Sequence, residues 1–440
     1  MYNKSIKIKN YKIQKLEYTN PVHCFEKFSN KYGSVLFTGH GNNTNSKYSI
    51  IGTSPNFEFQ YQIIDTDNQS SSDIWKSFKE LLNYSEFHKL EYPANMCGLI
   101  GFSTYELGRD VEILPKTTID SYKCPIVQIL AYKTYYIFDN LEKLTWKIDF
   151  EYEHENKFNL IKEDGSSFKI TNLSQESTPE EYLQKVKKIQ DYIVKGDVYE
   201  VNLTQQISGD FKGNPFSLFK QLFLVNDAPY SCYFNLGKIK IISNSPEMFL
   251  KVNKKQIETR PIKGTISRSI DPEKDQQNRL TLLNSEKDQA ELFMIIDLLR
   301  NDLGKIAEIG TVKVRNVKKL EPFKNVYHLV GIVEAILDNK YDYIDLIKAT
   351  FPGGSITGCP KIRSMEIIDE IETFTRNLYT GSIFIINQEY LNSSIVIRTA
   401  IINEDNIFIN SGGAITIDSD PEDEYKEMQT KIKNIMELLN

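Results

Sequence analysis

The 440-residue chain lacks several features that mark common classes of protein. No apolar run approaches the roughly 18 residues that suggest a membrane span, and the opening MYNKSIKIKN has no signal-peptide core. The 53 basic and 59 acidic residues are mixed along the chain and form no basic stripe. We therefore expect a cytoplasmic protein that binds neither nucleic acid nor a membrane.

Cysteine and histidine are also sparse, with five of each. The cysteines are widely separated, odd in number and form no C-x-x-C pair, which argues against a disulfide framework and against a zinc site. Cys359 lies in a glycine-rich segment, but no nearby histidine supports a nucleophile there. We interpret it as a small, tolerated side chain, and the scattered histidines argue against a histidine-based metal site.

What the chain does contain is enough apolar material for a large core, with 40% hydrophobic and 12% aromatic residues. Its length predicts two or three units, or one large two-lobed body. The sequence is polar and poorly periodic over residues 151–177. We therefore predict an N-terminal region over 1–165 and a C-terminal region over 176–440.

The N-terminal half has the β-branched and aromatic bias of strands. We predict strands at 34–39, 48–52, 57–64 and 126–139, a loop at 65–73 and a helix at 74–85.

The C-terminal half opens with clear helix signals: Thr178 as N-cap, Pro179 at the first position and Glu181 closing a capping box. Gly196 ends this helix. We predict further strands at 231–236, 239–244, 382–386, 393–402 and 407–410, a helix at about 286–302, and a last helix from Asp420 with a buried stripe of Tyr425, Met428, Ile432, Ile435 and Leu439. The expected fold is α+β, with large antiparallel-rich sheets packed as a sandwich and covered by helices.

Two acidic pairs lie on predicted helices. Asp288 and Glu291 interrupt an otherwise apolar helix, and Glu424 and Glu427 lie on the last helix with Lys431 one turn further along. Residues at i and i+3 share a helix face, and buried carboxylates need a partner. Mg²⁺ is typically held by one or two carboxylates plus waters and substrate oxygens, so these pairs predict a Mg²⁺ site. The alternative is two solvated helix faces, which spacing alone favours for the second pair.

A lysine and a glycine-rich turn complete the candidate chemistry. Lys263 in ETRPIKGT acts as a nucleophile if burial lowers its pKa enough to free the amine; otherwise it is a surface turn residue. The segment 351–372 leads three glycines into a helix whose N-terminus suits an anion such as a carboxylate. It lacks the order of a P-loop, and its alternative is an ordinary turn.

Taken together, the segments closely resemble the chorismate-utilising enzymes, which include anthranilate, aminodeoxychorismate, isochorismate and salicylate synthases. The matching stretches occur in the family's order and are GDVYEVNLTQ (196–205), SPEMFL (245–250), ETRPIKGT (258–265), KDQAELFMIIDLLRNDLG (287–304), HLVGIVEAIL (328–337), FPGGSITGCPKIRSMEIID (351–369), LYTGSIF (378–384), IVIRTAI (395–401) and SGGAITIDSDPEDEYKE (411–427). The resemblance covers essentially all of 178–440 and implies an anthranilate-synthase-like, two-lobed fold.

Within the family, PIKGT and the stretch GLIGFSTYELGRDVEILP (98–115) resemble the aminodeoxychorismate synthase component I branch, whereas anthranilate synthases usually carry Ala at Lys263. This branch implies a transferase that makes 4-amino-4-deoxychorismate for p-aminobenzoate and folate biosynthesis. The substrates would be chorismate and ammonia, the latter from a separate, transiently bound glutaminase, because no amidotransferase segment flanks the family region. The alternatives are an anthranilate synthase large subunit, an isochorismate or salicylate synthase, and a non-catalytic scaffold homologue.

The resemblance also implies roles for single residues. Glu291 and Glu427 correspond to direct Mg²⁺ ligands, with Asp288 and Glu424 as water-mediated neighbours. The remaining substrate contacts implied by the family are Tyr379, Arg398 and Gly412 for the pyruvyl carboxylate, and Thr357, His328 and Lys431 on the ring side.

The implied mechanism uses Glu247 as the general acid for the departing C4 hydroxyl and Lys263 as the nucleophile at C2. One residue departs from the pattern. Glu200 stands where amino-transferring members usually carry Gln and isochorismate-forming members carry Lys, which argues against isochorismate formation.

Overall fold

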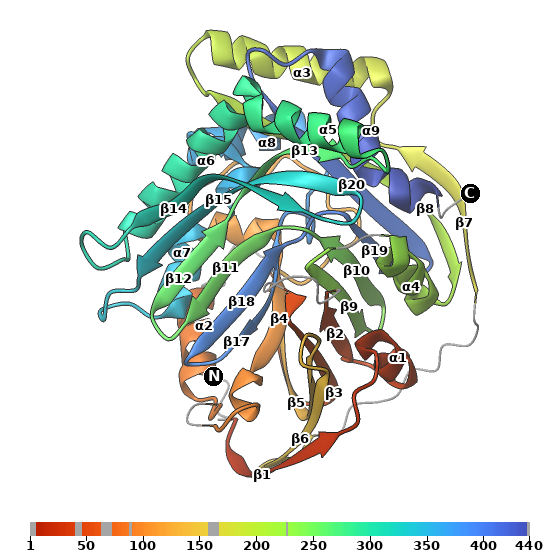
Figure 1. The fold of residues 1–440 in the computed structure, drawn as a ribbon, viewed down its shortest axis with the longest axis vertical. Helices are drawn as coiled ribbons and strands as arrows, with labels where there is room; N and C mark the ends of the chain where they lie inside the picture. The colour runs from red at the N-terminus through yellow and green to blue at the C-terminus, as the bar shows by residue number, and fades with distance from the viewer. Residues whose placement is uncertain are drawn as a thin grey trace.

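The computed structural model describes residues 6–39, 46–62, 73–87, 90–156, 167–225 and 228–437. Helices and strands alternate irregularly, and every strand ladder is antiparallel in the described ranges (Figure 1). The α+β fold predicted from the sequence is therefore confirmed. No helix within these ranges is long and apolar enough to cross a membrane.

The strands are β1 Ile8–Leu16, β2 Val35–Thr38, β3 Tyr48–Tyr61, β4 Leu99–Ser103, β5 Val127–Asp139, β6 Leu144–Tyr152, β7 Phe168–Gln175, β8 Glu200–Gly213, β9 Tyr230–Leu236, β10 Ile239–Ser245, β11 Met248–Asn253, β12 Gln256–Arg260, β13 Ile262–Ser267, β14 Lys313–Pro322, β15 Val326–Ile336, β16 Gly358–Cys359, β17 Ser382–Ile386, β18 Tyr390–Ile395, β19 Thr399–Asn403 and β20 Asn406–Ile415. The α-helices are α1 Pro21–Phe25, α2 Ile74–Asn83, α3 Pro179–Val194, α4 Pro215–Val225, α5 Pro272–Asn284, α6 Glu286–Gly304, α7 Tyr343–Thr350, α8 Lys361–Ile371 and α9 Pro421–Glu437.

Strands from the N-terminal half join two groups of C-terminal strands. One group runs from β14 through β15, β12, β11 and β18 to β17. The other runs from β9 through β10, β19 and β20 to β8. Between them, β17 pairs with β4, β4 with β5, β5 with β3, β3 with β2, and β2 with β9. The backbone hydrogen bonding is therefore continuous across the predicted boundary near residue 165, which stays a prediction.

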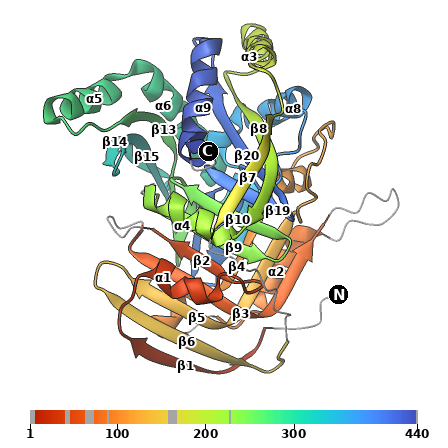
Figure 2. The ribbon, with the colours of Figure 1, turned by 90° about the vertical axis from the view of Figure 1, so that its right-hand side faces the viewer.

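Helices cover the end of the molecule opposite β1 and β6 (Figures 1 and 2). Helix α6 packs on β13, β14 and β15, while α3, α8 and α9 pack on β8 and β20. The buried stripe of α9 contains Met428, Ile432 and Ile435, as its 3.6-residue period predicts. Tyr425 is only half-buried, and Leu439 lies outside the described residues. The helices that carry the predicted acidic pairs, α6 and α9, thus lie at the same end.

Two strand predictions were wrong, and one strand was not predicted. Residues 48–52 and 57–61, predicted as two strands, belong to one strand, β3. The segment between them contains Ser54 at φ 59° and a β-bulge between Pro55 and Phe57, and the pairing with β5 continues on both sides of the bulge. The polar segment 151–177 contains β7, an edge strand whose one ladder is to β8 and whose side chains are mostly exposed. The last two residues of the predicted strand 57–64 and residues 65–72 of the predicted loop lie outside the described residues.

The third correction concerns 393–402, predicted as one strand. The chain instead ends β18 at Ile395 and starts β19 at Thr399, and Arg398 between them has φ 51°. This left-handed conformation interrupts the pleat, so the side chain of Arg398 leaves the regular in–out alternation of the sheet. The break is at a residue that the resemblance assigns to substrate binding.

Candidate active site

Lys263 is the centre of a buried ionic cluster. Its Nζ lies 2.7 Å from Glu200 Oε1 and 3.7 Å from Glu291 Oε2, and all three side chains are largely shielded from solvent. Strand β13 supplies Lys263, β8 supplies Glu200 and α6 supplies Glu291. The interpretation of Lys263 as a surface turn residue is therefore wrong.

Gly264, next to Lys263, allows α6 to approach β13. It has φ 72°, which favours glycine, and a Cβ built there would lie 2.9 Å from the carboxyl group of Asp288. The ladder between β13 and β15 also shifts register between Lys263 and Thr265. The ETRPIKGT motif thus gives a local backbone irregularity that places the lysine amine against the acidic face of α6.

The protonation of Lys263 differs from the prediction that burial alone frees its amine. Burial lowers the pKa of Lys263, but Glu200 and Glu291 oppose this more strongly, and the net pKa is raised above its ordinary value. The lysine is therefore an ammonium ion in the resting protein, and it must lose a proton before it can act as a nucleophile.

Two carboxyl groups in the cluster hold their protons to near neutral pH. Burial raises the pKa of Glu247 to about 7, opposed by a hydrogen bond from Ser355 and by Lys263. That bond joins Ser355 Oγ to Glu247 Oε1 at 2.6 Å. Burial likewise raises the pKa of Glu291 to about 7, with Lys263 opposing. A buried carboxyl group with a pKa near 7 is suited to general acid catalysis.

The second acidic pair is divided between two environments. Glu424 is buried and accepts hydrogen bonds from Ser419 Oγ at 2.7 Å and from Lys287 Nζ at 3.0 Å. The Glu427 side chain is 55% exposed and lies 2.9 Å from Lys431 Nζ. A solvated helix face thus describes Glu427 but not Glu424. The ion pair between Lys287 and Glu424 also ties α6 directly to α9.

The carboxylates of α6 and α9 can supply some, but not all, of the ligands that a hard cation such as Mg²⁺ needs. Among the described residues, no three Asp, Glu, His or Cys side chains gather closely enough to hold a metal ion by themselves. Mg²⁺ needs fewer protein ligands, because it keeps waters and takes oxygens from its substrate. The donors here are all carboxylate oxygens, and Lys263 and Lys287 now neutralise Glu291 and Glu424. The donor chemistry therefore fits Mg²⁺, provided that substrate completes the coordination.

A cationic group without a partner lies elsewhere in the site. Burial lowers the pKa of Arg398, and in the described part of the chain its guanidinium makes no hydrogen bond or ion pair. The same arginine contributes to the lowered pKa of His328, which burial brings to about 3. His328 is therefore neutral, with Nδ1 2.9 Å from Thr265 Oγ1. Arg398 is half-buried, and a partly desolvated guanidinium of this kind is suited to bind a carboxylate.

The other predicted contacts lie around β20 and the glycine-rich turn. Lys431 donates to the Gly412 carbonyl at 2.9 Å, and a Cβ on Gly412 would lie 2.8 Å from Thr204 Oγ1. Burial holds the pKa of Tyr379 above its ordinary value, so its hydroxyl remains a donor. The Thr357 hydroxyl donates to the Gly353 carbonyl at 3.1 Å, which commits it to holding the turn.

Sequence reasoning omitted several residues from the site. Glu200 was noticed only as a departure from a family pattern, although it is the nearest partner of Lys263. Ser355 and Lys287 lie inside segments quoted for the resemblance, and their spacing alone gave no signal. The N-terminus of α8, predicted to hold an anion, instead lies on a groove lined by Pro360, Lys361 and Ile362 and by none of the predicted site residues.

Comparison with known proteins identifies similar chains. The family described as chorismate binding enzyme matches residues 36–437. Aminodeoxychorismate synthase component 1 of Escherichia coli K12 is 34% identical, over 93% of this chain and 93% of that protein. Anthranilate synthase component 1 of Aquifex aeolicus is 32% identical, over 95% and 92%. Other relatives named aminodeoxychorismate synthase include bacterial and plant proteins.

Among solved structures, anthranilate synthase component I from Streptococcus pneumoniae is 27% identical and superposes with a TM-score of 0.73, covering 89% of this chain and 92% of that one. The overlap spans nearly the whole of both chains, so the antiparallel, helix-covered fold is shared.

Proposed function

We propose that this chain, which belongs to the family of chorismate binding enzymes, is the component of aminodeoxychorismate synthase that converts chorismate and ammonia to 4-amino-4-deoxychorismate. The observation that carries the proposal is the buried Lys263 amine in contact with Glu200 and Glu291. A lysine in this place supplies a nucleophile for the ring, which amination at C4 requires and direct amination at C2 does not.

The reaction divides into two displacements. Lys263, after losing a proton, attacks C2 of chorismate; the ring double bond shifts and the C4 hydroxyl leaves as water. Ammonia then attacks C4, the double bond shifts back, and the bond from C2 to the Lys263 nitrogen breaks. The sum is chorismate plus ammonia giving 4-amino-4-deoxychorismate plus water. The carboxylates of Glu200 and Glu291 lie within reach to take the proton from Lys263.

Glu247 supplies the proton that the departing hydroxyl needs. Burial raises its pKa to about 7, so a large fraction of the group is protonated at neutral pH. Ser355 Oγ, 2.6 Å from Oε1, fixes the orientation of the carboxyl group. Glu247 and Lys263 also interact electrostatically, which is consistent with action on one ring from two sides.

Two groups hold the substrate carboxylates. Arg398, which has no side-chain partner among the described residues, pairs with the pyruvyl carboxylate, assisted by the Tyr379 hydroxyl and the backbone near Gly412. Glu291 and Glu427, with Asp288 and Glu424 behind them, would hold Mg²⁺ for the ring carboxylate. Bound there, Mg²⁺ would act as a Lewis acid on that carboxylate while charge develops in the ring. Thr357, His328 and Lys431 lie on the ring side.

The partner that supplies ammonia is part of the proposal. Relatives named component 1 imply a second component, and we propose a separate glutaminase in that role. The cytoplasmic location predicted from the sequence stays a prediction.

The substitution Lys263→Ala tests the covalent route. We expect the C4-amino product to fall by at least roughly 100-fold, because the nucleophile is lost, while any residual amination shifts to C2. Products are identified by mass spectrometry and retention time. Lys251→Ala, in β11, is the matched control and should leave the product ratio unchanged. If Lys263→Ala made only the C4-amino product at the normal rate, the route would be wrong.

A second candidate is the anthranilate synthase large subunit, favoured by the Aquifex aeolicus relative. It requires ammonia to attack C2 directly, with no use for the buried lysine. The scaffold alternative would be expected to lose acidic or lysine positions, but Glu247, Lys263, Glu291 and Glu427 are all present.

A further inference from the structure

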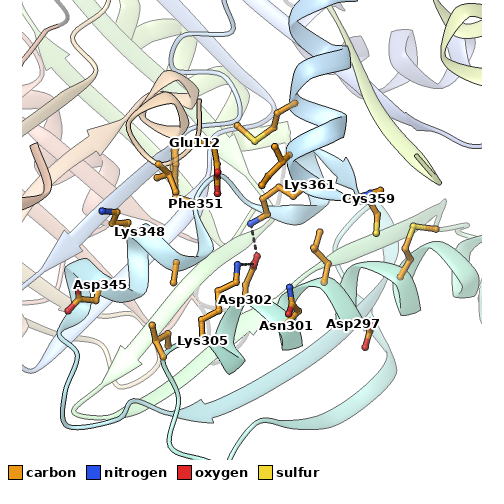
Figure 3. Close-up of a pocket in the computed structure, with 18 of the residues that line it drawn as sticks. Glu112, Asp297, Asn301, Asp302, Lys305, Asp345, Lys348, Phe351, Cys359 and Lys361 are labelled. Atoms are coloured by element: carbon orange, nitrogen blue, oxygen red, sulfur yellow. Dashed lines mark hydrogen bonds and ion pairs between the residues drawn. The ribbon is translucent and has the colours of Figure 1, made fainter. Parts of the chain in front are cut away.

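A groove separate from the residues of the proposed site runs between α6, α7 and α8 and has a volume of about 1050 Å³. Figure 3 shows Lys361 and Lys305 both directed at Asp302, with Cys359 at one end of the groove and Asp345 and Lys348 at the other. Asp302 pairs with Lys361 at 2.5 Å and with Lys305 at 3.0 Å. The two lysines therefore share one buried carboxylate, which offsets one of their two positive charges.

The Cys359 end of the groove lies against Glu200. Cys359, in β16, lines the groove and is the direct antiparallel partner of Glu200 in β8. Side chains of directly opposed residues in an antiparallel pair lie on the same face, with their Cβ atoms about 4.5–5.5 Å apart. Gly358 makes this close pairing possible, because a Cβ there would clash with the Glu200 carbonyl oxygen. Cys359 is therefore a groove residue that lies beside Glu200, and burial together with the nearby Glu200 charge raises the pKa of its thiol.

Helix α6 provides a second connection between the groove and the site. Met294 lines the groove and lies one turn beyond Glu291, which contacts Lys263. Residues three apart share a helix face, so the groove begins on the same face of α6 that carries the catalytic carboxylate. Two elements, β8 with β16 and α6, independently bring the inner end of the groove to the Glu200–Lys263 pair.

Glu200 itself has unused hydrogen-bonding capacity. Its Oε1 accepts from Lys263, but its Oε2 is fully buried and has no hydrogen-bond partner in the part of the chain that the structure describes. A buried carboxylate oxygen without a donor is costly unless a ligand satisfies it. The missing partner must be small and must donate hydrogen bonds.

We propose that Glu200 Oε2 is the binding site for ammonium, which reaches it along the groove past Cys359. The inference rests on the proposed function, in which ammonia is the second substrate. Ammonium has the size, the positive charge and the donors that the unpaired oxygen requires. Glu200 thus has two oxygens with two roles: Oε1 holds Lys263, and Oε2 holds the incoming ammonium. The ammonium gives one proton to the Glu200 carboxylate before the resulting ammonia attacks C4.

The groove is compatible with passage of a cation. Its lining has three lysines, of which Lys361 and Lys305 are engaged by Asp302, against four acidic side chains. The remaining charged lining residues are Lys348, Glu112, Asp297 and Asp345. A glutamine at the position of Glu200 would carry no negative charge. Glu200 would therefore give this chain a tighter hold on ammonium than a glutamine in the same place.

The test compares steady-state kinetics of Glu200→Gln with the unaltered chain, using chorismate, Mg²⁺ and ammonium chloride without a glutaminase. Glutamine retains an oxygen that can accept from Lys263 but loses the charge. We expect the KM for ammonium to rise about tenfold or more, since hydrogen bonds to charged groups are the stronger ones, with the KM for chorismate nearly unchanged. Glu404→Gln, on an exposed turn, is the matched control.

A fall in kcat at unchanged KM for ammonium would overturn the proposal, because Glu200 would then only position Lys263. A second variant, Cys359→Met, adds bulk at the inner end of the groove and leaves Glu200 in place. We expect it to lower kcat/KM for ammonium several-fold at unchanged KM for chorismate; an unchanged value would overturn the route. If the unaltered chain made no aminodeoxychorismate, the proposed function would fail before either variant was measured.

Discussion

Two arginines, the buried Arg376 and the half-buried Arg398, differ in whether other groups of the protein pair with them. Arg376, after α8, is fully buried and donates to Glu372 at 2.7 and 2.9 Å and to the carbonyls of Ile356 and Asn202 at 2.8 and 2.7 Å. Arg398, in the break between β18 and β19, makes no such contact among the described residues. The first stabilises the fold, and the second is left for a ligand.

The same contrast separates two buried glutamates. Glu372 is paired with Arg376, whereas Glu247 accepts hydrogen bonds from Ser355 Oγ and the Ile262 backbone and forms no ion pair within the described residues. Burial outweighs both the Ser355 hydrogen bond and the nearby charge of Lys263, and it raises the pKa of Glu247 to about 7. In these two comparisons, the ion-paired Arg376 and Glu372 stabilise the fold, whereas Arg398 and Glu247, which form no ion pair among the described residues, are assigned to the site.

The largest effect we expect is on stability, from Arg376→Ala. Removing one partner of a buried ion pair leaves Glu372 uncompensated and should reduce the free energy of unfolding by about 3–5 kcal/mol. Urea denaturation at pH 7 measures it. Arg398→Ala provides the comparison, and a similar loss in both variants would erase the distinction drawn between the two arginines.

The second prediction concerns the sign of a pH effect. The pKa of Glu247 is about 7 in the folded protein against an ordinary value of 4.5, so the folded state holds this proton more tightly than the unfolded state. Relative to Glu247→Gln, the unaltered chain should lose up to about 3 kcal/mol of stability as pH rises from about 4.5 to about 7, and no more above that. Denaturation at several pH values checks this; a difference independent of pH would contradict it.

The third prediction is that Arg398→Ala affects binding and not folding. The KM for chorismate should rise by roughly 100-fold, because a charge-assisted pair with a carboxylate is lost. Stability should change by less than about 1 kcal/mol. Arg398→Lys should recover only part of the affinity, since an ammonium lacks the planar fork of donors. Unchanged KM in Arg398→Ala would remove this residue from the substrate site.

The smallest effect is expected from Ser355→Ala. Its hydroxyl stabilises the ionised form of Glu247, so removal should move the pKa of Glu247 further upward, by about one unit. The free energy of unfolding is measured against pH for Ser355→Ala and for the double variant Ser355→Ala, Glu247→Gln. The pH at which half of the difference between the two has developed follows the pKa of Glu247. A downward movement would show that Ser355 does not act as a donor to this carboxyl group.

Sequence alone predicted the elements with strong periodicity and clear end signals. The capping box at Thr178 and Glu181 and the start of α9 after Asp420 are confirmed, because local interactions determine both. Strand β7 was missed because an exposed edge strand has no apolar alternation. The break at Arg398 was missed because the surrounding residues are all typical of strands.

For the site, the resemblance identified residues whose closeness no spacing could show. Lys263 and Glu200 are 63 positions apart, and their 2.7 Å contact depends on the packing of β8, β13 and α6. The raised pKa of Lys263 could not be predicted either, because it depends on how two carboxylates outweigh burial. Which atoms remain without partners, as in Arg398 and Glu200, is visible only in the folded chain.

The most direct measurement is the identity of the product. The purified chain is incubated with chorismate, Mg²⁺ and an ammonium salt, and the product is identified by mass spectrometry and retention time. We expect the product to be 4-amino-4-deoxychorismate, formed in a reaction that depends on Lys263. Anthranilate as the product would contradict it, because ammonia would then have reached C2 without the lysine.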